Sequence, residues 1–288
     1  MGFSKVAVLG GGLLGGSVAL ALRDRLDCVL WARRAETVGQ ARDAGVPRAT
    51  TNLEEALDEA ELVILAVPVG AMPGLLRQAI DAGIRPGAVI SDVGSVKQRV
   101  HEQLGPIARG GNLAFIGGHP MAGSERKGFE AADADLFEGS VCLLTDDEGI
   151  GDPAAARLEA FWTSLGCRVT WMEASAHDQI VARISHLPHV MAAATARVAM
   201  KSPEDARFGG GGLRDTTRVA GGDPGMWAEI LMENAPALLG PVREARDRLS
   251  EMLAMIEQSD HEALRQWLEL ACERHAEGKT RRENQGDD

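Results

Sequence analysis

The sequence predicts an α/β protein in which a doubly wound parallel sheet is followed by an all-helical domain. Over residues 1–172, short apolar runs typical of buried strands alternate with stretches of helical periodicity. Beyond residue 172 no clear strand pattern remains, and apolar residues recur at helical spacing. We therefore expect a first domain at 1–172, a helical domain at 173–279 and a flexible, charged tail at 280–288.

A glycine-rich turn follows the first predicted strand. The run Lys5–Leu9 leads into Gly10, Gly12 and Gly15, spaced as Gly-x-Gly-x-x-Gly, and a helical pattern starts near Val18. Between a strand and a helix this motif is typical of Rossmann-type dinucleotide binding. Its glycines allow a tight turn, close approach of a pyrophosphate and close helix–strand packing. The free N–H groups of the helix N-terminus would then face the phosphates.

The second predicted strand, Cys28–Ala32, is followed by Arg33 and Arg34. A site that prefers NAD usually has an acidic residue here, which accepts a hydrogen bond from the ribose 2′-hydroxyl. No acidic residue stands at this place, and a guanidinium group suits a 2′-phosphate. We therefore expect NADP to be favoured over NAD, with a solvated basic turn as the alternative.

Further strands are predicted at 62–67, 88–90 and 113–116. Ligands of doubly wound sheets bind at the carboxyl ends of the strands, so residues at these ends should converge on one edge. The predicted cofactor contacts are Gly10, Gly12, Leu13, Leu14, Gly15, Arg33, Arg34, Val67, Pro68 and Ser95.

One histidine, His119, stands directly after the strand predicted at 113–116. It lies between Gly118 and Pro120, which indicates a stiff turn that allows close approach of a ligand. A histidine at a strand end is well placed to transfer a proton near neutral pH. Taken alone, His119 could instead merely cap a loop.

The second domain is predicted to contain helices at 175–200, 224–239, 241–258 and 260–275. The first of these is apolar over most of its circumference, which indicates a buried helix, for example between subunits. His186 and His189 are three residues apart on it and project toward the same side. Pro188 separates them and no carboxylate stands at matching spacing, so we expect no metal. We expect both to face a substrate pocket, with satisfied core histidines as the alternative.

Two arginines follow a run of four glycines, Gly209–Gly212. Arg214 and Arg218 are four residues apart, so they share a face if a helix begins here. Such a pair could clamp two carboxylates, while a solvated pair is the alternative.

Composition narrows the class of partner. The formal net charge is −12, and the lysines and arginines are scattered, which argues against nucleic acid and anionic membranes as partners. The four cysteines lack metal-ligand spacing and the density of a disulfide scaffold, which favours free thiols in a reducing compartment. No basic-then-apolar leader and no run long enough to span a bilayer is visible, so we expect a cytoplasmic protein.

Taken together, the motifs resemble the prephenate/arogenate dehydrogenase (TyrA) family of tyrosine biosynthesis. The matching stretches run in family order across nearly the whole chain, at 10–17, 92–97, 118–125, 177–178, 185–189, 212–218 and 223–227. The resemblance implies a Rossmann domain followed by a helical dimerisation domain, and hence a homodimer. It also implies NAD(P)-dependent oxidative decarboxylation of a dianionic cyclohexadienol, yielding 4-hydroxyphenylpyruvate from prephenate or L-tyrosine from arogenate.

The resemblance also implies roles for individual residues. His119 would accept the proton of the substrate hydroxyl, and Ser95 would hold that hydroxyl and the nicotinamide together. Arg218 would bind a substrate carboxylate, with Arg214 as a second positive partner. His186 and His189 would line the pocket, and Glu125 would stand at its mouth.

Rival interpretations remain at this point. A β-hydroxyacid or imine-reducing dehydrogenase has the same two-domain plan, but the β-hydroxyacid enzymes should show a catalytic lysine at 175–200, where none occurs. A catalytically inactive NADP-binding sensor would not need His119, Ser95 and Arg218 together. Because the sequence ends near residue 288, we expect neither a fused chorismate mutase nor a regulatory ACT domain. The choice between prephenate and arogenate stays open, as does inhibition by tyrosine.

Overall fold

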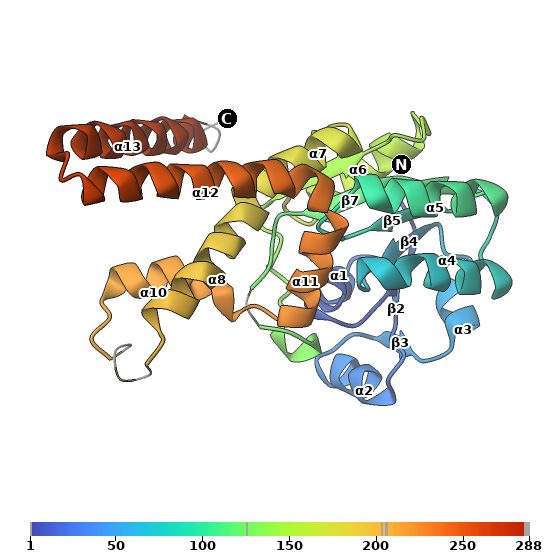
Figure 1. Cartoon of the computed structure of the whole chain (residues 1–288). Helices are drawn as coiled ribbons and strands as arrows, with labels where there is room; N and C mark the ends of the chain where they lie inside the picture. Colours follow the sequence, from blue (N-terminus) through green and yellow to red (C-terminus); the bar gives the residue numbers. More distant parts are fainter. Residues whose placement is uncertain (1, 125, 203, 205–206, 285–288) are drawn as a thin grey trace. The chain divides into compact units, whose positions relative to one another are not determined.

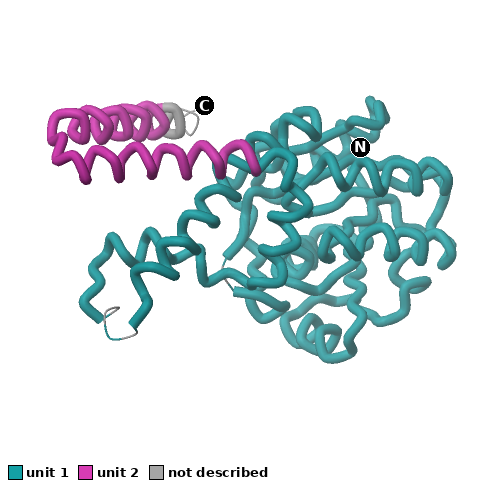
Figure 2. Tube along the Cα trace, in the orientation of Figure 1, with its two compact units in different colours: residues 1–238 teal, residues 239–288 magenta. Residues whose placement is uncertain are grey.

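The computed structural model describes residues 2–124, 126–202, 204 and 207–284 (Figure 1). The chain forms two compact units, residues 1–238 and 239–288, which are described separately (Figure 2).

The first unit is built on a six-stranded sheet whose neighbouring strands are all parallel, which confirms the predicted α/β class. The strand order is β3-β2-β1-β4-β5-β6, so the direction of winding reverses between β1 and β4. In doubly wound sheets, ligands bind at such a reversal, beside the carboxyl ends of the strands. The strands are β1 (Lys5–Leu9), β2 (Asp27–Trp31), β3 (Arg48–Thr50), β4 (Leu62–Leu65), β5 (Val89–Asp92) and β6 (Ala114–Phe115).

Helices cover both faces of this sheet (Figure 1). Successive strand residues point to opposite faces, so Val6 and Val8 join one hydrophobic cluster while Ala7 and Leu9 join the other. Burial on both faces explains why the strands read as continuous apolar runs. The covering helices are α1 (Leu13–Leu22), α2 (Ala35–Asp43), α3 (Leu53–Leu57), α4 (Met72–Asp81) and α5 (Gln98–Gly110), with a short 3-10 turn, η1, at Val69–Ala71.

A second, three-stranded sheet follows, and it corrects the predicted setting of His119. The histidine does not lie in a turn at a strand end but inside β7, where it is opposite Leu143. The glycines before it serve close approach, since a Cβ atom on Gly118 would lie 2.7 Å from the Asp92 carbonyl oxygen. The strands are β7 (Gly117–Pro120), antiparallel to β8 (Val141–Thr145), which pairs in parallel with β9 (Arg168–Trp171). A 3-10 turn, η2 (Phe129–Ala131), and helix α6 (Ala154–Ser164) lie between these strands in sequence.

Beyond β9 the described residues form only helices. The helix predicted at 175–200 is present in three parts. The central part is π-helical and ends two residues before Pro188, which lies in the first turn of the next helix. Proline cannot donate a backbone hydrogen bond, and a locally widened helix accommodates that loss. The helical segments of the first unit are α7 (Ala174–Val181), η3 (Ala182–His186), α8 (Leu187–Ala199), α10 (Gly211–Thr217), η4 (Arg218–Gly221) and α11 (Pro224–Glu233).

The last two helices depart from the expected boundaries. Helix α12 (Ala235–Glu257) passes through Pro241, where we expected a break, and the break lies instead after α11 at Asn234. Helix α13 (His261–Asn284) extends through residues expected to form a flexible tail. The Thr280 hydroxyl there bonds back to the Ala276 carbonyl within the helix. No helix in the described parts of the chain is both long enough and apolar enough to cross a membrane.

Candidate active site

The glycine-rich loop between β1 and α1 has the geometry that a dinucleotide needs. Gly10 has a φ of +129°, and a Cβ atom there would lie 2.2 Å from the Ala66 carbonyl oxygen. A Cβ atom on Gly15 would lie 2.0 Å from the Gly10 oxygen, so helix and strand pack too closely for a side chain. At Gly12, the N-cap of α1, an added Cβ atom meets nothing within 4 Å. The open space and the N–H groups of α1 therefore fit a pyrophosphate.

The other predicted cofactor contacts occupy nearby strand ends. Val67 follows β4, and its side chain lies beside the loop, 3.1 Å from where a Gly10 Cβ atom would stand. Leu13 and Leu14 open α1 and are half-buried, and Pro68 is exposed just before η1. Ser95 is half-buried in the turn after β5, and among the described residues its hydroxyl makes no hydrogen bond.

Two exposed arginines stand at the end of β2, the strand next to β1. The guanidinium groups of Arg33 and Arg34 have no hydrogen bond or ion pair within the part of the chain that the structure describes, while the Arg34 carbonyl accepts from the Val38 N–H group at 3.3 Å. The Gly10 N–H group donates to the Trp31 carbonyl at 2.9 Å, which ties the glycine loop to this strand end.

Sequence reasoning missed a buried ion pair beneath the site. The Lys97 ammonium group and the Asp92 carboxylate are both fully buried and in direct contact. Asp92 also accepts hydrogen bonds from the N–H groups of Gly94, at 2.8 Å, and Gly118, at 3.1 Å. A buried charge needs such a complete set of partners. The pair therefore joins the end of β5 to the start of β7 and holds both sides of the Ser95 turn.

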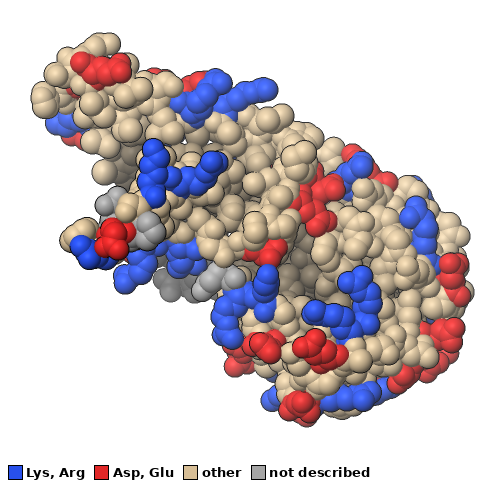
Figure 3. Space-filling model, turned by 60° about the horizontal axis from the view of Figure 1, so that its bottom comes forward, with Lys and Arg blue, Asp and Glu red and all other residues tan. Residues whose placement is uncertain are grey.

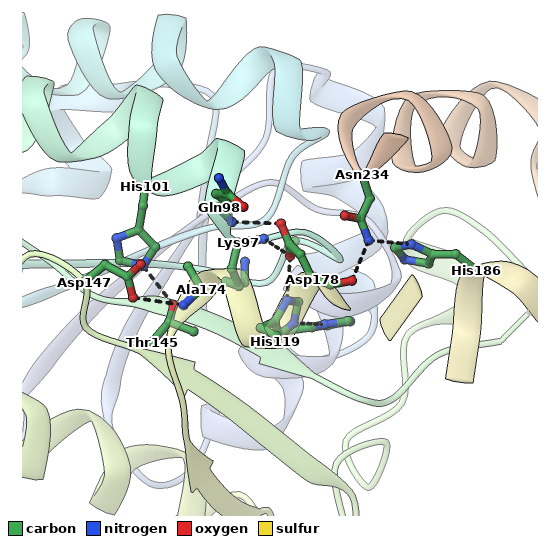
Figure 4. A network of polar contacts seen from close by, with 12 residues as sticks. Lys97, Gln98, His101, His119, Thr145, Asp147, Ala174, Asp178, His186 and Asn234 are labelled. Carbon is green, nitrogen blue, oxygen red and sulfur yellow. Dashed lines mark hydrogen bonds and ion pairs between the residues drawn. The ribbon is translucent and has the colours of Figure 1, made fainter. Parts of the chain in front are cut away.

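A line of hydrogen bonds runs from α7 to His119 (Figure 4). The Asp178 carboxylate accepts from the backbone N–H groups of Lys97, at 2.7 Å, and Gln98, at 3.0 Å, where α5 begins. Its Oδ1 atom lies 2.7 Å from His177 Nδ1, and His177 Nε2 lies 2.8 Å from His119 Nδ1. The described residues provide no hydrogen-bond partner for His119 Nε2.

The two predicted pocket histidines are brought together by α11. The His189 ring stacks on Trp227, with the centroids 3.6 Å apart and the planes 10° from parallel. The His186 ring meets the same indole edge-on at 6.2 Å. Asn234 bonds to His186 Nδ1 at 3.0 Å and donates to the Asp178 carbonyl at 2.9 Å (Figure 4). His186 Nε2 and His189 Nδ1 are buried polar atoms without a hydrogen-bond partner among the described residues.

The arginines of the second half lie where a helix begins, as expected. Arg214 lies in α10 and is exposed, with its guanidinium group 3.5 Å from Asp215. Arg218 starts η4, which packs against α8, the helix that carries His189. The two arginines therefore do not lie on one continuous α-helix, because the chain changes to 3-10 geometry at Arg218. The predicted Glu125 lies outside the described residues.

The buried histidines of this region have lowered pKa values. Burial, the neighbouring histidines His177 and His186, and Lys97 hold the pKa of His119 well below its usual value. Burial also lowers the pKa of His177, against the opposing effect of Asp178, and lowers that of His186 to about 4. These rings are therefore neutral in the folded protein near pH 7.

We expect acid to destabilise the protein through these histidines. Each has a lower pKa folded than unfolded, so the unfolded chain binds more protons below about pH 6.5 and stability falls as pH drops. For His186 the loss of unfolding free energy should be about 2 kcal/mol between pH 7 and pH 5. Urea unfolding at several pH values measures it. His186→Gln should flatten the dependence by that amount, whereas His275→Gln, at an exposed site, should not.

The sequence analysis predicted no function for several residues that the structure places around the candidate site. Lys97, His177 and Trp227 lie within the stretches that resemble the family, so that resemblance was the signal that could have found them. Asp178 follows His177 directly, but its contacts with α5 are 80 and 81 residues away in sequence. Asn234 lies in no motif, and no sequence signal pointed to it.

Basic and acidic side chains alternate around the visible face in Figure 3, without one broad basic surface. The expected lack of a nucleic-acid partner and of a metal ion nevertheless stays a prediction.

Comparison with known proteins identifies the class. The family description "Prephenate dehydrogenase, nucleotide-binding domain" matches residues 18–171, and "Prephenate dehydrogenase, dimerization domain" matches residues 173–270. Prephenate dehydrogenase of Lactococcus lactis subsp. cremoris is 30% identical over 92% of this chain and 75% of the relative. Cyclohexadienyl dehydrogenase of Zymomonas mobilis is 34% identical over 82% of this chain and 83% of the relative.

Solved structures agree. A crystal structure of prephenate dehydrogenase from A. aeolicus in complex with hydroxyphenyl propionate and NAD+ has a TM-score of 0.85 and 28% sequence identity. The similarity covers 96% of this chain and 99% of that one. The chain therefore belongs to the prephenate dehydrogenase family. It is a dehydrogenase with a Rossmann-type domain for a pyridine nucleotide, followed by the family's dimerization domain.

Proposed function

We propose that this enzyme carries out the NAD(P)-dependent oxidative decarboxylation of prephenate or arogenate. The observation that carries the proposal is His119, a buried ring whose low pKa keeps it neutral and whose Nε2 atom has no hydrogen-bond partner among the described residues. A neutral imidazole of this kind can accept the proton of an alcohol while the carbon–hydrogen bond breaks. When bound, the nicotinamide supplies the hydride acceptor.

For the remaining residues we propose the roles that the family resemblance implies. Ser95, whose hydroxyl has no hydrogen-bond partner among the described residues, would hydrogen-bond the substrate hydroxyl and orient it toward His119. Arg218 would bind a substrate carboxylate, and Arg214 would add positive charge in a protein of net charge −12. Loss of carbon dioxide makes the ring aromatic, so it is thermodynamically favoured.

The pocket histidines would line the substrate site. His186 Nε2 and His189 Nδ1 are buried without partners among the described residues, and each would form a hydrogen bond with a polar substrate group; since the Asn234 amide donates to His186 Nδ1, His186 Nε2 would be the donor in its bond. Trp227 holds the His189 ring by stacking, which fixes the direction of these nitrogens. Glu125, which lies outside the described residues, remains a candidate from the family resemblance alone.

We expect NADP to be preferred over NAD, because two exposed guanidinium groups, without an ion pair among the described residues, stand where an acidic residue would bind the ribose 2′-hydroxyl. A steady-state assay of prephenate and arogenate, each with NAD and NADP, tests both the function and this preference. Replacing Arg33 and Arg34 together by Ala should raise KM for NADP on the order of tenfold to a hundredfold. KM for NAD should change little.

Arg48→Ala is the matched control, since Arg48 is also a half-exposed arginine near this strand but pairs with Asp27. It should leave both KM values unchanged. The function proposal fails if no pairing turns over. The cofactor proposal fails if the double variant affects NAD and NADP equally.

We also propose a homodimer formed through the helical region, in a cytoplasmic enzyme with its domain boundary near residue 172. Ile184 and Val198 are 60% and 76% exposed in the single chain, although their helix is apolar over most of its circumference. On α12, Leu249, Leu253 and Ile256 repeat at helical spacing and are exposed. A second copy would cover such surfaces. The four free cysteines, three of them buried, are compatible with a reducing compartment.

A further inference from the structure

We propose that Asp178 and His177 are positioning residues that set the tautomer of His119, so that its Nε2 atom is the unprotonated base. The proposal rests on the proposed function of His119 and adds how the base is prepared. It is carried by the direction of the hydrogen bonds in the line shown in Figure 4, in which two backbone N–H groups bond to Asp178, Asp178 bonds to His177, and His177 bonds to His119.

The direction is set at the Asp178 end. The backbone N–H groups of Lys97 and Gln98 can only donate, so both Asp178 oxygens act as acceptors. These N–H groups belong to the first turn of α5, whose positive dipole end stabilises a negative charge. Asp178 is therefore a carboxylate, and it has no proton to give to His177.

The acceptor role of Asp178 determines which nitrogen of His177 carries the proton. Because Asp178 Oδ1 is an acceptor at 2.7 Å, the proton of the neutral His177 ring must be on Nδ1. The ring is fully buried and its pKa is lowered, so it carries one proton only. His177 Nε2 is then a lone-pair acceptor.

The acceptor role of His177 Nε2 in turn determines which nitrogen of His119 carries the proton. Its Nδ1 atom lies 2.8 Å from His177 Nε2 and must donate, so the proton of the neutral ring is on Nδ1. The lone pair is then on Nε2, the nitrogen without a partner among the described residues. An imidazole without such neighbours exchanges between two tautomers, one of which cannot accept a proton at Nε2.

The same line stabilises the product of proton transfer. When the substrate O–H bond breaks and the His119 Nε2–H bond forms, the ring becomes a cation. The Nδ1–H bond to His177 then strengthens, and His177 is polarised in turn by the Asp178 carboxylate. The other titratable groups facing His119 are Lys97 and His186, and both lower its pKa. Asp178 and Asp92 oppose Lys97, since both raise the pKa of His177; Asp178 does so through its hydrogen bond to that ring, while Asp92 is paired with Lys97 itself.

A purely structural role is the competing explanation, because buried polar groups need partners whatever the chemistry. The two explanations differ in what they predict for the ring protons. They also differ for variants that keep the packing but change the charge.

The direct test is nitrogen-15 NMR of the imidazole rings in the full-length protein near pH 7. Both His119 and His177 should give the spectrum of rings protonated at Nδ1, and His119→Asn assigns the first signal by removing it. A His119 ring protonated at Nε2 would overturn the proposal. This readout needs no turnover, so it separates failure of the relay from failure of the proposed function.

Kinetics provide the second test, on whichever substrate pairing is active. Asp178→Asn keeps an accepting oxygen but removes the charge, so kcat should fall on the order of tenfold to a hundredfold with little change in KM. The acid limb of the kcat profile should move to lower pH, because His119 becomes a weaker base. His177→Gln keeps an accepting oxygen near the position of His177 Nε2, where it can still accept from His119 Nδ1. This variant should therefore retain more activity than His177→Leu.

His101→Gln is the matched control. His101 is also buried and bonds to Thr145 at 2.8 Å, but it does not contact His119 (Figure 4). This variant should lose stability without any shift in the acid limb. The relay is refuted if Asp178→Asn leaves the acid limb in place, or if the Gln and Leu variants at position 177 have equal kcat values.

Discussion

Replacing His119 by Asn should lower kcat by roughly a hundredfold or more while leaving cofactor binding nearly unchanged. The Asn amide can still donate to His177 Nε2, so the buried hydrogen bond at 2.8 Å has a replacement and the fold should persist. What the variant lacks is a nitrogen that can accept a proton. Steady-state kinetics on the active pairing, with NADP binding followed by calorimetry, measure both effects.

The pH profile adds a second expectation for the wild type. Because the pKa of His119 is held well below its usual value, kcat should be level from about pH 8 to pH 6 and fall only at lower pH. A kcat within threefold of wild type for His119→Asn would remove His119 from the chemistry. Loss of NADP binding in the same variant would mean that the fold, and not the base, had been damaged.

Replacing Lys97 by Met should destabilise the protein by about 3–5 kcal/mol. Methionine has nearly the length of lysine, so packing is largely kept, but the Asp92 carboxylate is left fully buried without its counter-charge. Two backbone N–H groups remain to it, which is too little for a buried anion. The measurement is the free energy of unfolding in urea at pH 7.

Two comparisons isolate this effect. Lys5→Met removes a surface ion pair with Asp58, whose side chain is 67% exposed, and should cost at most about 1 kcal/mol. The double variant Asp92→Asn with Lys97→Met should recover part of the loss, because no unpaired charge is left. A cost below about 1 kcal/mol for Lys97→Met would show that Asp92 is protonated or hydrated in the fold.

Local patterns accounted for the first half of the molecule well. The predicted strand, glycine turn and helix are present, and a side chain has no room at Gly10 or Gly15, because these elements are all set within about twenty residues. The parallel sheet followed for the same reason, since strands buried on both faces are continuous apolar runs. The separate sheet of β7, β8 and β9 could not be predicted, because pairing between distant short strands leaves no periodic signal.

The site was predicted less completely because its contacts are long-range. His119, His186 and His189 stood out in the sequence as candidate site residues, and all three lie in the first unit. The roles of Lys97 and Asp178 depend on partners in other elements, such as the 2.7 Å bond between the Lys97 N–H group and Asp178. The helix break expected at Pro241 was wrong, because helix α12 continues through it. Local propensity cannot show how neighbouring helical turns compensate for the hydrogen bond that proline lacks.

Asp178 lies on α7 and accepts hydrogen bonds from the start of α5, so the proposed base depends on contact between two distant helices. A chain without α7 would hold the glycine loop but lack the Asp178 carboxylate that, in our proposal, fixes the proton of His119. The loop that would hold the nucleotide and the group that would prepare the base are therefore supplied by different parts of the chain.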